Sequence, residues 1–135
     1  MVTRDSNFKL VPELADTFTP NKTGNVWTIR VKKGVKFHNG RELTADDVIY
    51  TIQRVLNPDT KAIRAGSLSG VDAAKMKKVD KYTVSVTLKS ANVTFDEIFS
   101  NYAMGIVPVG YDPANPVGTG PFKYKSFTPG VKSVY

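Results

Sequence analysis

Two segments of the chain alternate strictly between apolar and polar residues. In residues 26–33 every second residue from Trp27 to Val31 is apolar, and residues 82–89 repeat the pattern from Tyr82 onward. A period of two places these side chains on one face of an extended backbone and their neighbours on the other. We therefore predict two β-strands, each with one face in the core and one in solvent. The place of Trp27 in this alternation favours a core role over stacking on a ligand.

Turn-forming residues follow the first of these strands. Gly34 supplies a turn after two lysines, and Asn39-Gly40 is a strong hairpin signal because both residues tolerate positive φ. Val35 and Phe37, between the two turns, restore the alternation. We predict that this short second strand folds back on the first before a helix begins.

Helical periodicity takes over in two later segments. The first begins at Thr44, whose hydroxyl can cap the amide of Asp47, and ends at Asn57-Pro58. The second begins with the capping-box pair Thr94 and Glu97. The apolar stripes of these two short helices are Val48, Ile49, Ile52, Val55 and Leu56 in the first, and Phe95, Ile98, Phe99 and Tyr102 in the second.

Three shorter segments complete the predicted fold. Residues 61–70 lack a clear period, which predicts a loop with one helical turn, and Ile106–Pro108 is typical of a short buried strand ended by proline. Phe122 to Phe127 alternates as a strand, and a turn at residues 128–130 leads into a partner strand from Val131. The fold class that follows is a mixed α+β domain, a mainly antiparallel sheet with two short helices.

Composition narrows the possible chemistry. The 135 residues are 41% hydrophobic, which fits one domain with its own core, and the absence of cysteine excludes disulfides, thiolate metal sites and cysteine nucleophiles. The single histidine, His38, has no companion ligands at usable spacing, and no Gly-x-Ser-x-Gly element supplies a nucleophile. We therefore expect no catalytic residue, no metal and no cofactor, which argues against a hydrolase.

The net charge of +7 raises one alternative function, a small basic module that binds nucleic acid. Lysines gather in residues 32–36 and 75–81, but exposed aromatic residues do not alternate with them, and acids such as Asp72 and Asp80 interrupt the runs. This distribution favours a solvated basic surface. The alternative would be supported by strongly salt-dependent binding of an oligonucleotide.

A glycine-rich element, Gly118-Thr119-Gly120, stands near the end of the chain. A phosphate loop requires Gly-Lys-Ser/Thr and a helix after its glycines, whereas Pro121 opens a predicted strand here. We predict a structural turn in which backbone segments approach closely.

Two of these elements carry a family resemblance. Residues 26–40, VWTIRVKKGVKFHNG, with Thr44–Val48 after them, resemble the signature region of family 5 extracellular solute-binding proteins, the peptide- and nickel-type receptors of ABC importers. The sequence GTGPF in residues 118–122 resembles the element with which these receptors leave their small domain and re-enter the larger one. The resemblance covers residues 8–131 and keeps both signatures in order.

The resemblance implies an architecture and a location. Residues 1–116 would form the small α+β domain of a class C, periplasmic-binding-protein-like receptor, and residues 117–135 the start of the return into the larger lobe, truncated here. Family members begin with an export signal, whereas residues 1–5 lack its apolar core. We therefore expect an excised piece of a periplasmic or lipid-anchored cell-surface protein. Its partners would be a peptide or similar solute and an ABC permease, with no nucleic acid.

The same resemblance implies two ligand-contact regions. Ala65, Gly66 and Ser67 align with a stretch that approaches the ligand in some family members. Met104 lies where a strand faces the cleft in several members, and Thr119 lies nearby; from the sequence alone, Met104 also fits a gap-filling core role. Small side chains in these regions fit a roomy peptide cleft better than a tight metal-chelate site.

The implied mechanism is binding without chemistry. Backbone and side-chain donors would hold an extended peptide, closure of two lobes would bury it, and the closed form would dock on the permease. Because most of the opposite lobe is missing, we expect no measurable peptide affinity for these residues alone. Residues 117–135 are expected to pack poorly, or to recruit a second copy of the chain to cover an open sheet edge.

Overall fold

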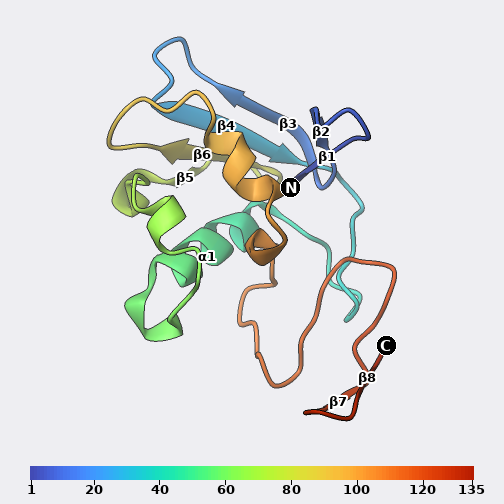
Figure 1. Ribbon diagram of the computed structural model, residues 1–135. Coiled ribbons are helices and arrows are strands. Elements are labelled where there is room, and N and C mark those ends of the chain that lie inside the picture. The colour runs from blue at the N-terminus through green and yellow to red at the C-terminus, as the bar shows by residue number, and fades with distance from the viewer.

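The computed structural model describes residues 1–135 and is built around a four-stranded antiparallel sheet (Figure 1). The strands lie in the order β3 (Ala15–Pro20), β4 (Val26–Val31), β6 (Thr83–Thr87) and β5 (Lys77–Lys78). The helix α1 (Ala45–Leu56) lies on one side of this sheet. The α+β class with a mainly antiparallel sheet is therefore confirmed.

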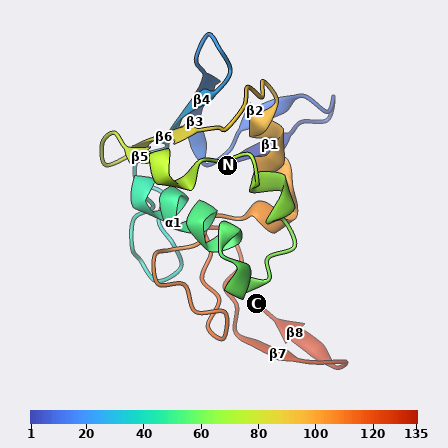
Figure 2. The same ribbon diagram turned by 90° about the vertical axis from the view of Figure 1, so that its left-hand side faces the viewer.

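Two further hairpins lie outside the central sheet. At the start of the chain β1 (Val2–Arg4) pairs with β2 (Leu10–Pro12), and at its end β7 (Ser126–Thr128) pairs with β8 (Lys132–Val134). The second hairpin projects away from the sheet and from α1 in both side views (Figures 1 and 2). No helix combines the length and the apolar character needed to cross a membrane.

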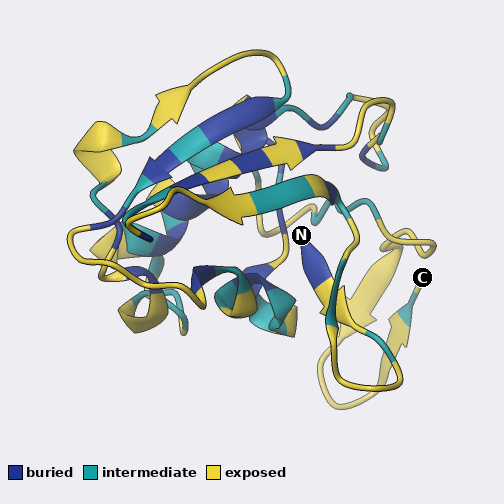
Figure 3. Ribbon diagram, turned by 90° about the horizontal axis from the view of Figure 1, so that it is seen from above, coloured by how far each residue is buried: buried dark blue, intermediate teal, exposed yellow.

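The predicted alternation in the first strand is confirmed. Trp27, Ile29 and Val31 are buried, while Thr28 and Arg30 are exposed on the opposite face of β4. Figure 3 shows buried and exposed stretches alternating along the strands of the sheet. The second predicted strand, β6, lies beside β4 in antiparallel register, with its valines also buried. The apolar faces of both strands thus form one wall of a single core.

An aromatic cluster connects this wall to the second predicted helix. The ring centroids of Phe18, Trp27, Phe95 and Phe99 lie 5.4–6.1 Å apart, with three of the five ring pairs in edge-to-face geometry. The indole Nε1 of Trp27 donates a hydrogen bond to the carbonyl oxygen of Asn92 at 2.9 Å. Trp27 is therefore a core residue, as predicted.

The second helix differs in type and length from the prediction. It is a 3₁₀ helix, η4 (Phe95–Ser100), and its stripe of Phe95 and Phe99 is buried. Tyr102, predicted to continue that stripe, is 92% exposed because the chain leaves η4 at Asn101 and begins a separate short turn, η5 (Tyr102–Met104). The helical period therefore does not carry through to Tyr102, and the prediction for this residue was wrong.

The first helix begins and ends at the predicted residues. The carboxylate of Asp47 accepts a hydrogen bond from the backbone amide of Thr44 at 2.8 Å, which anchors the N-terminus of α1. At the other end Asn57 is extended, and the short 3₁₀ helix η1 (Pro58–Thr60) follows. The helical turn predicted within residues 61–70 is η2 (Gly66–Leu68), and one more such turn, η3 (Ala73–Lys75), precedes β5.

The strand predicted at Val35 and Phe37 does not pair with β4. Both edges of β4 are already occupied by β3 and β6, so this segment instead turns on itself and forms a single bridge between Lys36 and Glu42. The two glycines of this segment, Gly34 and Gly40, have φ angles of 76° and 84°. The predicted turns are present, but the predicted hairpin on β4 is absent.

Two further predicted strands are absent or displaced. Ile106 is buried, but its segment joins no sheet: the Thr51 hydroxyl accepts from the Val107 amide at 3.1 Å and donates to the Val107 carbonyl at 3.3 Å. The Thr51 side chain of α1 thus provides the backbone hydrogen bonds that a neighbouring strand would otherwise provide. Phe122 and Tyr124 precede β7 and are exposed, so the C-terminal hairpin is shorter than predicted.

Candidate functional site

A cleft of about 660 Å³ opens between the N-terminal hairpin and the last third of the chain. Its walls come from residues 1–3 and 13–14, from residues 99–106 and from residues 118–121. Two of the sequence-predicted contact residues, Met104 and Thr119, line this cleft together. It is therefore the candidate solute-contacting surface of the chain.

The base of the cleft is apolar. Phe99 and Met104, which line it, are each no more than 2% exposed, and Ile106 is 4% exposed. The side chain of Asn101 positions Met104 by accepting a hydrogen bond from the Ala103 amide at 3.0 Å, which closes the turn η5. Met104 thus combines the gap-filling role with a position in the wall of the cleft.

Tyr102 is a cleft residue that the sequence reasoning did not identify. It lines the cleft with nearly its whole side chain exposed. The missed signal is Asn101, because an Asn immediately after a helix readily starts a new turn and resets the helical phase. An exposed aromatic ring beside an apolar base offers a flat, amphipathic contact surface for a solute.

Thr119 reaches the cleft from a segment whose hydrogen bonds to the rest of the molecule go to His38. The His38 amide donates to the Gly118 carbonyl oxygen at 2.9 Å, and the ring Nε2 lies 2.7 Å from the Gly120 carbonyl oxygen. The Gly118 amide donates to the ring Nδ1 at 3.4 Å. The two signature segments, 80 residues apart in sequence, are therefore in direct contact.

The other predicted contact residues lie elsewhere. Ser67 lines a separate hollow of about 70 Å³, with Phe95 and Ile98 among its walls. Ala65 and Gly66 line neither this hollow nor the cleft. The structure brings together Met104 and Thr119 but not the segment 65–67, whose role in binding stays a prediction.

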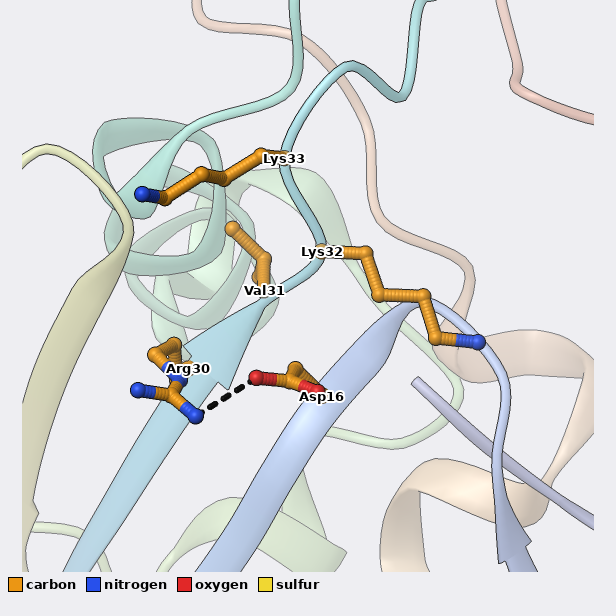
Figure 4. Close-up of a pocket in the computed structure, with 5 residues that line it drawn as sticks. All are labelled: Asp16, Arg30, Val31, Lys32 and Lys33. Carbon is orange, nitrogen blue, oxygen red and sulfur yellow. Dashed lines mark ion pairs between the residues drawn. The ribbon is translucent and has the colours of Figure 1, made fainter.

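A basic hollow of about 350 Å³ lies at the end of β4 (Figure 4). Arg30 in its wall is paired with Asp16 at 2.7 Å, and the side chains of Lys32 and Lys33 point in opposite directions away from it. A phosphate site requires converging cations, and these lysines diverge. The nucleic-acid alternative therefore gains no support from this surface.

A network of polar groups around Glu42 has a structural role. The Glu42 carboxylate accepts from Lys81 at 2.8 Å, from the Gly34 amide at 2.9 Å and from the Tyr82 hydroxyl at 3.0 Å. The Lys81 ammonium first, and then the Gly34 amide, lower the pKa of Glu42 to about 2, and Glu42 raises the pKa of Lys81 to about 12. Both groups remain charged at neutral pH and tie the Gly34 turn to the start of β6.

Residues that could hold a metal ion do not cluster. No three His, Asp or Glu side chains lie close enough to form a metal site, and the ring nitrogens of His38 face backbone groups.

The adjacent acids Asp46 and Asp47 have separate partners. Asp46 pairs with Lys78 at 2.7 Å, whereas the buried carboxylate of Asp47 accepts from Arg41, from Thr44 and from the Val109 amide.

Comparison with known proteins relates this arrangement to one family. Residues 9–135 match the profile of the bacterial extracellular solute-binding proteins, family 5 middle. The oligopeptide-binding protein AppA of Bacillus subtilis is 32% identical over an alignment 139 residues long, gaps included, that covers 93% of this chain and 25% of AppA. The glutathione-binding protein GsiB of Pectobacterium atrosepticum is 32% identical over an alignment 130 residues long, which covers 89% of this chain and 24% of GsiB. The chain thus spans about a quarter of the length of these relatives.

The backbone matches solved structures of such proteins. AgaA of A. tumefaciens R10, in complex with agropinic acid, superposes with a TM-score of 0.87 at 29% identity and covers 98% of this chain, which matches 28% of AgaA. Because these matches extend over nearly the whole chain, the sheet, α1 and the segment that carries Thr119 belong to one shared architecture.

Proposed function

The chain belongs to the family 5 bacterial extracellular solute-binding proteins, and from that premise we propose that it is part of the receptor of an ABC importer for peptides or similar solutes. In this proposal the chain supplies one wall of a solute cleft and carries out no chemistry. The observation that carries it is the convergence of Met104, Tyr102 and Thr119 on a cleft with an apolar base and an open mouth.

The character of the cleft supports a peptide-like solute. Its apolar base suits side chains of varied shape, while the Thr119 hydroxyl and the exposed backbone of Gly105 supply hydrogen-bonding groups at its walls. Backbone recognition combined with a roomy apolar surface binds an extended chain without selecting strongly for its sequence. AppA and GsiB, which bind oligopeptides and glutathione, fit this class.

The proposed working form is larger than these residues. A second lobe would cover the cleft, close over the solute and present the closed form to a membrane permease. The family is extracellular, so the receptor works in the periplasm or at the cell surface; attachment by a lipid anchor is part of the proposal.

Exchange of this chain for its counterpart in AppA tests the proposal. AppA of Bacillus subtilis has been solved in complex with a nonapeptide. We expect a chimera in which residues 9–135 replace the matching quarter of AppA to bind a nonapeptide with micromolar or tighter affinity in calorimetry. The matched variant Thr119→Val should weaken binding about tenfold, the typical effect of one lost hydrogen bond. Lys22→Ala, a substitution outside the cleft, is the control and should leave the affinity unchanged.

A chimera that is folded by circular dichroism and still fails to bind peptide would contradict the proposal. The 135 residues alone should show no measurable peptide affinity, because a solute held on one wall keeps most of its surface in water. Micromolar binding by the isolated chain would contradict the need for a second lobe.

A further inference from the structure

The segment that carries Thr119 depends on a single residue for its hydrogen bonds. Every hydrogen bond within the chain that residues 117–124 make goes to His38: one from its backbone amide and one at each ring nitrogen. The partners are the carbonyl oxygens of Gly118 and Gly120 and the amide of Gly118, on both sides of Thr119. His38 therefore bonds to the backbone on both sides of the predicted contact residue, twice at Gly118 and once at Gly120.

His38 and Thr119 lie on opposite sides of this segment. Thr119 lines the 660 Å³ cleft, which His38 does not reach. His38 lines two other hollows, of about 330 and 420 Å³, and Thr119 lines neither. Gly118 and Gly120 line both the cleft and the 420 Å³ hollow, so their backbone separates the two residues.

We propose that His38 is the positioning residue of the solute cleft, since it holds the backbone on both sides of Thr119 so that the threonine side chain faces the solute. This inference rests on the proposed function, but its geometry is independent of any ligand. Close packing does not explain the contact, because a Cβ added at Gly118 would meet only the His38 Cε1, at an ordinary 3.8 Å. Val117, at the start of the segment, packs against the core, and the bonds to His38 hold the backbone beyond it.

The pattern of bonds assigns a ring tautomer. The Gly118 amide is a donor, so Nδ1 must be unprotonated to accept from it. The neutral ring then carries its proton on Nε2 and donates it to the Gly120 carbonyl oxygen. A histidine in this tautomer is the only side chain of its size that offers an acceptor and a donor on opposite edges of one rigid ring.

The test measures the order of the segment in the 135-residue chain without solute. Amide order parameters of Gly118, Thr119 and Gly120 should be near 0.8 in the natural chain and fall below about 0.6 in His38→Phe, which keeps a ring but removes both ring nitrogens. His38→Gln, which retains a donor for Gly120, should restore part of the order. Asn39→Ala, in the same turn, is the matched control and should leave the order of Thr119 unchanged.

The ring itself provides a second measurement that needs no variant. Nitrogen chemical shifts of His38 at neutral pH should show a protonated Nε2 and an unprotonated Nδ1. The opposite tautomer, or order parameters below 0.6 for Gly118–Gly120 in the natural chain, would overturn the proposal even if His38→Phe failed to fold. Unchanged order in a folded His38→Phe would also overturn it.

Binding in the AppA chimera separates this inference from the function on which it rests. Because His38 acts through Thr119, His38→Phe and Thr119→Val should each weaken nonapeptide binding about tenfold and together by little more than either alone. Fully additive losses would overturn the positioning role. A chimera that binds no peptide, while His38 still orders Thr119, would contradict the proposed function but not the positioning role of His38.

Discussion

Residues 26–56 and residues 117–135 carry the most distinctive sequence patterns of the chain, but they fold in opposite ways. The first segment buries Trp27, Ile29, Val48 and Ile52 in the core. The second is exposed at every residue from 120 to 133, although β7 and β8 are formed. Local hydrogen bonds are therefore enough to shape a hairpin, whereas burial is what makes a segment part of a stable domain.

The largest expected contrast comes from one aromatic residue in each region. Trp27→Ala removes the centre of the aromatic cluster and should cost about 3–5 kcal/mol of unfolding free energy. Phe122→Ala removes a ring that is 72% exposed and should change the free energy of unfolding by less than about 0.5 kcal/mol. Urea denaturation of both variants measures the difference, and similar losses would show that the C-terminal segment is packed in solution.

A smaller contrast separates two neighbouring acids of α1. The Asp47 carboxylate is fully buried and accepts from Arg41, Thr44 and Val109, so Asp47→Ala should cost about 3 kcal/mol by leaving these donors unmatched. Asp46→Ala, which breaks only the exposed pair with Lys78, should cost about 0–1 kcal/mol. Equal effects in urea denaturation would contradict the buried network.

The acid dependence of stability should report on Glu42. Its pKa is held at about 2, mainly by Lys81 and the Gly34 amide, and the ordinary value is 4.5. Because the folded pKa is the lower one, the contribution of Glu42 is fully present above pH 4.5 and is lost as the pH falls toward 2. Glu42→Gln should lower stability at neutral pH and flatten its decline between pH 4.5 and 2.

Urea midpoints at several pH values measure this effect. Lys81→Met should produce a similar flattening, because Lys81 is the main cause of the lowered pKa. A Glu42→Gln curve that runs parallel to that of the natural chain from pH 6 to pH 2 would show that this carboxylate does not control the acid transition.

The smallest expected effect is weak association through the C-terminal region. The β7–β8 hairpin has free edges and exposed Phe127 and Val131, which favour pairing with a second copy. Light scattering should therefore show a mass that rises with protein concentration, and Phe127→Lys should reduce the rise. A constant monomer mass at all concentrations would refute the association.

The strand β4, the strand β6 and the helix α1 follow from the sequence alone. Each has a period that matches its own geometry, and Thr44, Asp47 and Asn57-Pro58 mark the helix ends through contacts a few residues apart. The placement of Trp27 in the core follows from the same alternation. These features depend on short-range chemistry, so they can be deduced without knowing the rest of the fold.

Only the tertiary structure decided which segments meet. The edges of β4 were taken by β3 and β6, which left Val35 and Phe37 without a strand partner. Likewise, the Thr51 hydroxyl bonds to the Val107 backbone, where a neighbouring strand was expected. Tyr102 lines the cleft because a new turn begins after Asn101 and ends the helical period.

The contacts of Asp47 with Val109 and of His38 with the Gly118 segment also belong to the tertiary structure. They join residues 62 and 80 positions apart. The hydrophobic period predicts which face of a helix or strand is buried. It does not predict which other segment of the chain will pack against that face. The packing of the whole core determines which distant segments become neighbours. The cleft, whose walls come from such segments, therefore could not be predicted from the sequence.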